Sequence, residues 1–158
     1  MSEPGIERAW ELMQSVRFCM LSTWNGSKLR SRPMAAFVQR QEGLVYFFTD
    51  VRAHKDEEIA RYPQVCLAFA NADGQKYVTV NGTATIVSDR AMIRKLWSIP
   101  TKIWWDTPED PNIRLIRVRP EEAEYWDTPG NVVSSIKVAF ALATGAHVDY
   151  GDHKKVAF

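Results

Sequence analysis

The sequence has few of the residues that hold metal ions or build disulfide frameworks. Its three histidines, His54, His147 and His153, are scattered, and no pair has the spacing of metal ligands. The two cysteines, Cys19 and Cys66, lie in apolar strand-like runs without a CxxC partner, so we expect buried free thiols rather than a disulfide. The glycine-rich patterns of Rossmann and P-loop nucleotide sites are missing as well. We therefore expect no metal site, and no catalytic triad can be assembled from the sequence.

Long apolar runs and an excess of charge are also missing. No apolar run approaches the roughly 20 residues of a membrane-spanning helix, and the first sixteen residues lack the apolar centre of a secretory signal peptide. The chain has 20 basic and 19 acidic residues, a net charge of +1, which gives no electrostatic case for binding nucleic acid or anionic membrane. We expect a cytoplasmic protein that binds neither nucleic acid nor membrane.

What is present describes one globular domain, residues 1–158, in which a C-terminal helix and tail occupy about 131–158. Of all residues, 46% are hydrophobic, enough for a sizeable core in a chain of this length. Six tryptophans are many for so short a chain. Large aromatic side chains on a surface favour a protein interface or a stacked planar ligand.

Hydrophobic periodicity predicts a mainly β fold (α+β) with short helices between its strands. Alternating residues predict strands over 17–24, 27–38, 44–50, 64–71, 75–88, 113–120 and 121–126. Helical spacing predicts helices from Pro4 to about residue 15, and over 54–62, 89–97 and 132–144, the last closed by Gly145. Asn25-Gly26 and Asp73-Gly74 predict hairpin turns, and Gly82 inside a strand predicts a bulge or bend. We expect six or so antiparallel strands in a small barrel, a proline-rich loop over 104–112, and a polar surface tail.

The stretch "FFTDVRAHKDEEIA" places cations at the expected start of a helix. His54 and Lys55 follow a strand that ends at Thr49-Asp50. Cations in a first helical turn oppose the helix dipole, whereas exposed N–H groups, a lysine and a hydroxyl together can bind phosphate. The alternative is a solvated lysine that the following three acidic residues balance.

The strand "KLRSRPMAAF" puts Arg30, Arg32 and Met34 on one face and interrupts the ladder with Pro33. If this strand lies beside the end of the strand over 44–50, an anion held by Lys55 could also reach an arginine. An edge strand protected from aggregation by arginine and proline is the alternative interpretation.

Three short motifs together resemble the FMN-binding split barrels of the pyridoxamine 5′-phosphate oxidase-like superfamily, and most closely their bacterial general stress protein branch. They are "SRPM", "FFTD…HK" and "YVTVNGTA", and the stretches "PEDPNIRLIRVRPEEAEYWD" and "GDHKKV" are similar to the C-terminal half of that branch. The resemblance covers nearly the full length. It implies a six-stranded antiparallel split β-barrel with short flanking helices, and a homodimer with FMN at each end of the interface.

The resemblance also implies a set of cofactor-binding residues. Those expected to line the isoalloxazine, mostly through backbone, are Arg32, Pro33 and Met34. Those expected beside the ring and ribityl chain are Phe48, Thr49 and Asp50. His54 and Lys55 would hold the phosphate, and Trp126, together with Trp104 and Trp105, could cover the flavin from the partner subunit or pack in the core.

This sequence departs from the oxidases at two points. Ala53-His54-Lys55 stands where the oxidases have Ser-Arg-Lys, so Arg30 or Arg52 would have to compensate for the lost hydroxyl and charge. The tail "HVDYGDHKKVAF" has no convincing equivalent of the motif by which the oxidases read their substrate phosphate, which argues against vitamin B6 oxidation.

Two functions from different classes fit this resemblance. One is an FMN-dependent oxidoreductase acting on a small molecule, and the other is a stress protein that sequesters or senses FMN without turnover. A relative that binds haem or deazaflavin is a third reading, because one fold hosts several planar cofactors. No residue is placed clearly enough to be assigned as catalytic.

Overall fold

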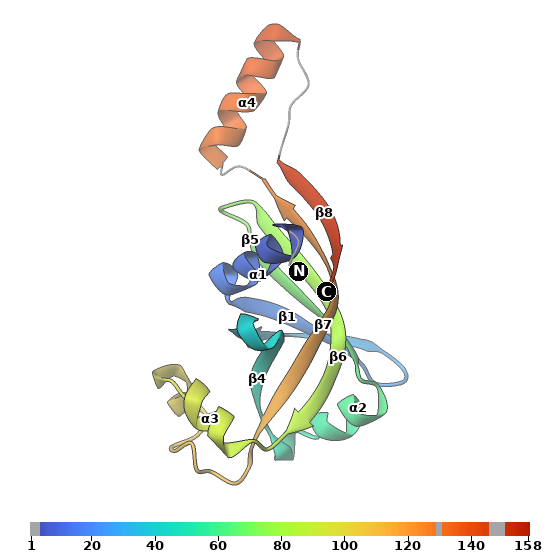
Figure 1. Cartoon of the computed structure of the whole chain (residues 1–158), viewed down its shortest axis with the longest axis vertical. Helices are drawn as coiled ribbons and strands as arrows, with labels where there is room; N and C mark the ends of the chain where they lie inside the picture. Colours follow the sequence, from blue (N-terminus) through green and yellow to red (C-terminus); the bar gives the residue numbers. More distant parts are fainter. Residues whose placement is uncertain (1–3, 129–130, 146–150) are drawn as a thin grey trace.

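The computed structural model describes residues 4–128, 131–145 and 151–158. In this part of the chain, eight strands form one antiparallel sheet that curls into a half-barrel (Figure 1). The strands are β1 (Phe18–Trp24), β2 (Leu29–Ala35), β3 (Phe37–Gln39), β4 (Leu44–Asp50), β5 (Gln64–Asn71), β6 (Lys76–Val87), β7 (Ile113–Asp127) and β8 (Asp152–Ala157). Their order is β2-β1-β5-β6-β7-β4-β3, and β8 pairs with β7. The predicted antiparallel split-barrel fold is confirmed.

The barrel is split because its two end strands are joined by the chain but not paired with each other. β2 and β3 occupy opposite ends of the sheet order, and only Ala36 separates them in sequence. The amide of Ala36 donates to the carbonyl of Arg17 at 2.8 Å, which anchors this crossing point beside the start of β1. Successive strands therefore curl around a common interior without closing the ladder.

The described residues form four α-helices, of which three lie against the sheet (Figure 1). The helices are α1 (Pro4–Val16), α2 (Lys55–Arg61), α3 (Arg90–Leu96) and α4 (Asn131–Thr144), and short 3₁₀ turns are η1 (Arg40–Glu42), η2 (Val51–Ala53) and η3 (Ile99–Ile103). α1 packs four buried side chains into the main core, and α2 adds Ile59, which is 1% exposed. α4 projects beyond the body of the barrel, past the ends of β7 and β8 (Figure 1). None of the helices in the described ranges is both long enough and apolar enough to cross a bilayer.

The observed strands differ from the predicted strand segments at three places. The stretch over 27–38 divides into β2 and β3, because the chain crosses the split at Ala36. The two strands expected over 113–120 and 121–126 form one strand, β7, which passes through Pro120 beside the bulge in β6. The tail expected to be only polar surface ends in β8, which adds to β7 with Trp126 opposite His153.

Glycines produce the bends that the sequence predicted. The β6–β7 register shifts between Asn81 and Gly82, and a Cβ on Gly82 would lie 2.5 Å from the carbonyl oxygen of Arg119. The first hairpin also forms, but Gly26 and Ser27 occupy the centre of its turn: Asn25 N–H donates to the Lys28 carbonyl at 3.2 Å, and Gly26 has φ 93°. Glycine at the first central position matches a type II′ turn rather than the predicted type I′.

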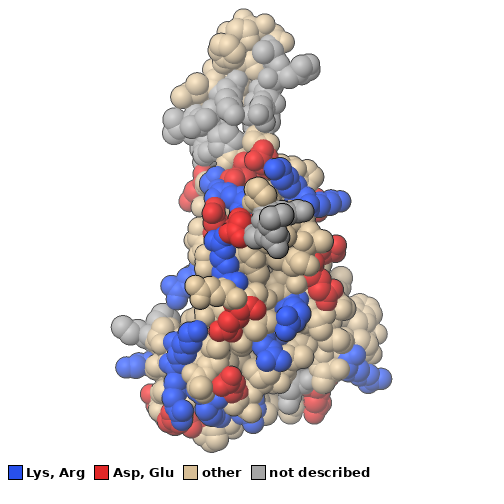
Figure 2. Space-filling view, viewed as in Figure 1, with Lys and Arg blue, Asp and Glu red and all other residues tan. Residues whose placement is uncertain are grey.

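Charges of both signs are mixed on the face of the molecule in view. Figure 2 shows acidic and basic side chains intermixed over the visible face of the barrel. Both cysteines are free, as predicted. Burial raises the pKa of the Cys19 thiol to about 12, which leaves it protonated and unreactive.

Candidate functional site

Arg32 lies on the core side of β2, next to α2. It pairs across strands with Leu21, which is fully buried, so its side chain enters the barrel interior rather than solvent. The Nη2 atom donates to Thr23 Oγ1 at 2.8 Å and lies 3.7 Å from Glu58 Oε1 on α2. The expected pairing of the arginine strand with the end of β4 is wrong, because β2 pairs with β1 and not with β4. Arg32 instead contacts the α2 segment through Glu58.

The guanidinium of Arg32 is poorly satisfied for a buried charge. Its side chain is 11% exposed, and its Nε and Nη1 atoms are buried without a hydrogen-bond partner in the described part of the chain. Burial lowers the pKa of Arg32, the Glu58 carboxylate acts in the opposite direction, and Arg30 adds to the lowering. Arginine stays protonated in proteins, so the lowered pKa means that burying this charged side chain costs free energy.

The end of β4 divides the predicted residues between two environments. Thr49 lies on the face of β4 that carries the core residues Val45 and Phe47. It is 5% exposed, and its Oγ1 has no hydrogen-bond partner among the described residues. Phe48 points to the other face, into a second aromatic cluster with Phe37, whose ring centroid lies 5.2 Å away. Thr49 is thus free to bind a ligand from the barrel side, whereas the Phe48 ring is used in packing.

The carboxylate of Asp50 already accepts hydrogen bonds from neighbouring side chains. It accepts from Arg52 Nη2 at 2.6 Å and Nε at 2.8 Å, and from Trp105 Nε1 at 3.0 Å. The hydrogen bonds from Arg52 are the main reason that the pKa of Asp50 is held well below its usual range. These contacts pin the loop carrying Trp105 to the end of β4. They also occupy the Arg52 guanidinium, one of the two groups proposed to compensate at the phosphate.

The start of α2 lies where the sequence predicted it. His54 is exposed, adopts the left-handed conformation with φ 58°, and makes no side-chain cap bond. Lys55 is the first residue of α2, but its side chain lies outside the part that the structure describes. α2 has only seven residues, so its dipole is a weaker argument for phosphate than the sequence indicated.

Pro33 and Met34 follow the alternation of β2. Pro33 is exposed opposite Met20 on the outer face, and Met34 packs against the main core. β2 is an edge strand, where proline is tolerated.

Trp126 is far from these residues within one chain. Thr49 pairs with Arg114, and Trp126 lies twelve residues further along β7 (126 minus 114), which is roughly 40 Å of strand. Its indole stacks on His153 with ring centroids 4.9 Å apart and planes 10° from parallel. Within one chain, Trp126 therefore does not lie beside Thr49.

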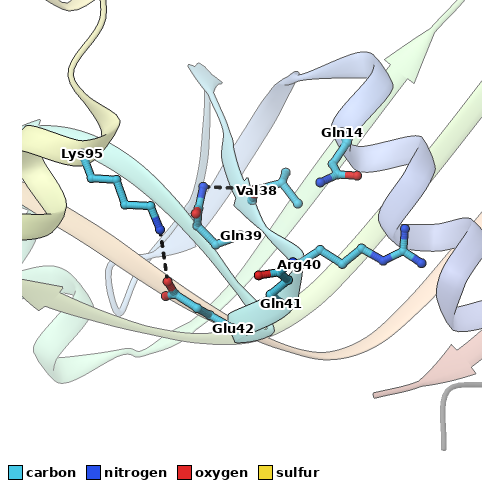
Figure 3. A pocket seen from close by; sticks show the side chains of 7 residues that line it. All are labelled: Gln14, Val38, Gln39, Arg40, Gln41, Glu42 and Lys95. Atoms are coloured by element: carbon cyan, nitrogen blue, oxygen red, sulfur yellow. Dashed lines mark hydrogen bonds and ion pairs between the residues drawn. The ribbon is translucent and has the colours of Figure 1, made fainter.

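A polar hollow lies elsewhere, between α1, the β3–η1 segment and α3 (Figure 3). Its lining includes Gln14, Gln39 and Arg40, and Lys95 approaches Glu42 at 3.6 Å. None of the predicted cofactor-binding residues lines it. No group of three or more potential metal-ligating side chains occurs among the described residues.

Two residues of the site were missed by sequence reasoning. Thr23 is 1% exposed and shares its β1 face with Leu21, and its hydroxyl donates to the Glu58 carboxylate. Alternation in β1 could have placed Thr23 on the core face. Glu58, one helical turn after Lys55, was interpreted only as a charge that balances the lysine.

Comparisons with known proteins agree with the observed fold. A family model described as pyridoxamine 5′-phosphate oxidase like matches residues 5–149. General stress protein 26 of Bacillus subtilis is 33% identical over 106 residues, which cover 65% of this chain and 74% of that protein.

Two solved structures resemble this fold over most of the chain. A general stress protein 26 from Jannaschia sp. CCS1 superposes with a TM-score of 0.81 at 24% identity and covers 96% of both chains. The general stress FMN/FAD binding protein of Xanthomonas citri superposes with a TM-score of 0.67 at 25% identity, over 76% of this chain and 86% of that one.

Proposed function

The chain belongs to the pyridoxamine 5′-phosphate oxidase-like family, and we propose that it is a flavoprotein that binds FMN at the α2 end of the barrel. Similarity to the general stress FMN/FAD binding protein of Xanthomonas citri supports a flavin, and the chemistry at Arg32 supports a phosphate-bearing one. The resemblance of the sequence to the stress protein branch points to the same cofactor.

The observation that carries this proposal is a set of buried donors without acceptors. Among the described residues, the buried side-chain nitrogen and oxygen atoms without a partner are Arg32 Nε, Arg32 Nη1 and Thr49 Oγ1, and both residues had been predicted to bind the cofactor. Leaving a buried polar group unpaired costs about 1–3 kcal/mol, and more for a charged one, so such groups call for an explanation. A phosphate would supply the acceptors and the negative charge that Arg32 lacks. The residues present therefore fit FMN.

In this proposal, Arg32 and Lys55 bind the phosphate, and Thr49 contributes a hydroxyl from β4. His54 would add its exposed imidazole, and the backbone of Pro33 and Met34 would border the ring, as the family resemblance implies. Phe48 and Asp50 would act mainly by holding the aromatic wall beside the site, because their side chains already contact Trp105.

FMN, when bound, supplies one- and two-electron redox chemistry, and the protein contributes binding, orientation and exclusion of water. An oxidoreductase acting on a small molecule is our first functional candidate, and sequestration or sensing of FMN without turnover is the second. Anaerobic mixing of the flavin-loaded protein with NADH or NADPH separates them. Bleaching of the flavin absorbance supports the oxidoreductase, and an unchanged oxidised spectrum with both donors supports the second candidate.

We propose a homodimer built on the outer face of β1, β2, β5 and β6. This face exposes large apolar side chains, namely Phe18, Met20, Trp24, Leu29 and Tyr77, of which Phe18 is 64% and Leu29 76% exposed. They adjoin in register: Met20 lies opposite Pro33, and Trp24 opposite Leu29. Contiguous apolar patches of this kind mark interfaces in proteins that are otherwise polar outside. In such a dimer, Trp126 of the second chain could lie against the proposed FMN site of the first.

Light scattering tests the dimer. We expect the mass of two chains for the wild type and of one chain for Leu29→Asp. Ile103→Asp is the matched control, since Ile103 is 77% exposed but lies on η3, away from this face. A wild-type protein that has the mass of one chain with FMN bound would contradict the proposal.

Titration with FMN and with riboflavin, followed by flavin fluorescence, tests the cofactor. We expect oxidised-flavin absorbance bands and much tighter binding of FMN, because riboflavin lacks the phosphate. Lys55→Ala should weaken FMN roughly ten- to a hundredfold, the value of one charge-assisted hydrogen bond, whereas Lys28→Ala at the exposed hairpin should not. Equal affinity of the wild type for FMN and riboflavin would remove the phosphate argument.

A further inference from the structure

Thr23, Glu58 and Arg32 form a buried hydrogen-bonded chain that joins three elements. Thr23 on β1 accepts a hydrogen bond from Arg32 Nη2 at 2.8 Å and donates its own hydrogen to the Glu58 carboxylate on α2. Thr23 is 1% exposed, and the Arg32 and Glu58 side chains are 11% and 19% exposed. Water has little access to compete for these bonds.

The direction of this chain follows from the donors and acceptors available. A guanidinium can only donate and an ionised carboxylate can only accept, so the threonine hydroxyl must accept from Arg32 and give its single hydrogen to Glu58. Threonine is β-branched and stiff at χ1, and this one is packed beside Leu21 in the core face of β1. The hydroxyl is therefore a fixed point to which one nitrogen of the guanidinium is attached.

This attachment leaves the other two nitrogens for a ligand. Nε and Nη1 of Arg32 are buried and have no partner among the residues that the structure describes, while Nη2 is held by Thr23. A guanidinium fixed at one nitrogen keeps its plane and the direction of its remaining donors, and donors placed in advance lose less entropy when an acceptor binds.

We propose that Thr23, oriented by Glu58, is a positioning residue that aims Arg32 at the phosphate of the bound flavin and so sets the preference for a phosphate-bearing flavin over riboflavin. The proposal rests on the proposed function, because it assumes that Arg32 binds that phosphate. Thr23 does not touch the ligand in this scheme and acts only through Arg32.

The test compares FMN and riboflavin affinity in Thr23→Val, Thr23→Ser and the wild type. Valine has nearly the shape of threonine without the hydroxyl, so we expect FMN affinity to fall about tenfold while riboflavin affinity is unchanged. Serine keeps the hydroxyl and should restore most of the preference. A residue with only a structural role would change both affinities together.

Thr83 on β6 provides the matched control. Its Oγ1 accepts from Gln64 Nε2 at 3.2 Å and donates to Glu121, which is the same pattern of bonds outside the proposed site. We expect Thr83→Val to leave the ratio of FMN to riboflavin affinity unchanged.

A double-mutant cycle completes the test. In an Arg32→Met background, adding Thr23→Val should cost no further FMN affinity, because its effect passes through Arg32. An undiminished preference for FMN in Thr23→Val, or an additive loss in the double variant, overturns the inference and leaves the phosphate site standing. A wild type without preference for FMN refutes the proposed site itself.

Discussion

Replacing Arg32 with methionine separates ligand binding from folding, because the arginine is unsatisfied in the free protein. The substitution keeps an unbranched chain of similar length in the interior and removes the charge together with the partnerless Nε and Nη1. It also removes the hydrogen bond to Thr23 and the 3.7 Å ion pair with Glu58. Exchanging a buried ion pair for apolar residues is often neutral or stabilising by about 1–4 kcal/mol, although here Glu58 remains.

The expected change in the free energy of unfolding without ligand is therefore small, within about 1 kcal/mol of the wild type. Glu58 keeps its bond from the Thr23 hydroxyl and is partly exposed, so it is not left alone in an apolar interior. The effect on FMN should be large. Loss of charge-assisted bonds to phosphate weakens binding by about 1.5–3 kcal/mol, or roughly ten- to a hundredfold.

Urea unfolding with and without FMN measures both quantities in one assay. At an FMN concentration one hundred times the wild-type dissociation constant, the ligand stabilises the wild type by about 2.7 kcal/mol. For a variant that binds about thirtyfold more weakly, the same concentration stabilises by only about 0.9 kcal/mol. Riboflavin should stabilise both proteins equally.

Arg119→Met is the control, since Arg119 is an exposed arginine on β7. It should retain the full FMN stabilisation. The reasoning is refuted if Arg32→Met lowers the stability of the ligand-free protein by more than about 3 kcal/mol and keeps its FMN stabilisation, because Arg32 would then be a structural residue paired with Glu58.

Three further predictions concern the fold. Phe47→Ala should lower the free energy of unfolding by about 3–5 kcal/mol in urea, since Phe47 is fully buried; a loss below 1 kcal/mol would contradict its place in the core. Gly82→Ala should cost about 1–3 kcal/mol in the same assay because its Cβ would meet the Arg119 carbonyl at 2.5 Å, and an unchanged midpoint would argue against the bulge. The pKa of Asp127 is lowered to about 2, mainly by the hydrogen bond from Arg8, so the stabilising contribution of Asp127 is full above its unfolded pKa near 4 and is lost as pH falls toward 2. Asp127→Asn should therefore flatten the acid part of the curve of unfolding free energy against pH. An unchanged acid part of that curve would refute the assignment.

The sequence alone determined the elements whose cause is local. Alternation predicted the strand segments, glycine placed the bend at Gly82 and the end of α4 at Gly145, and isolated cysteines in apolar runs predicted free thiols. Helical spacing found α1 and α2 to within two residues at each end that the structure describes. These features depend on neighbours within a few residues, so one sequence contains the information. The resemblance added the split-barrel fold and the region in which we propose the site.

Only the tertiary structure decided which of these elements meet. The order of the strands separates β2 from β4, and the crossing at Ala36 leaves β2 and β3 at opposite ends of the sheet. The partners of Arg32 come from β1 and α2, which lie nine and twenty-six residues away in the chain (32 minus 23 and 58 minus 32). β8 pairs with β7 although α4 separates the two strands in sequence, and this pairing stacks Trp126 on His153. Alternation specifies the face of the strand on which a side chain lies. The curling of the sheet decides which other residues that side chain meets. This curling depends on contacts among strands that are far apart in sequence, so local patterns do not reveal it.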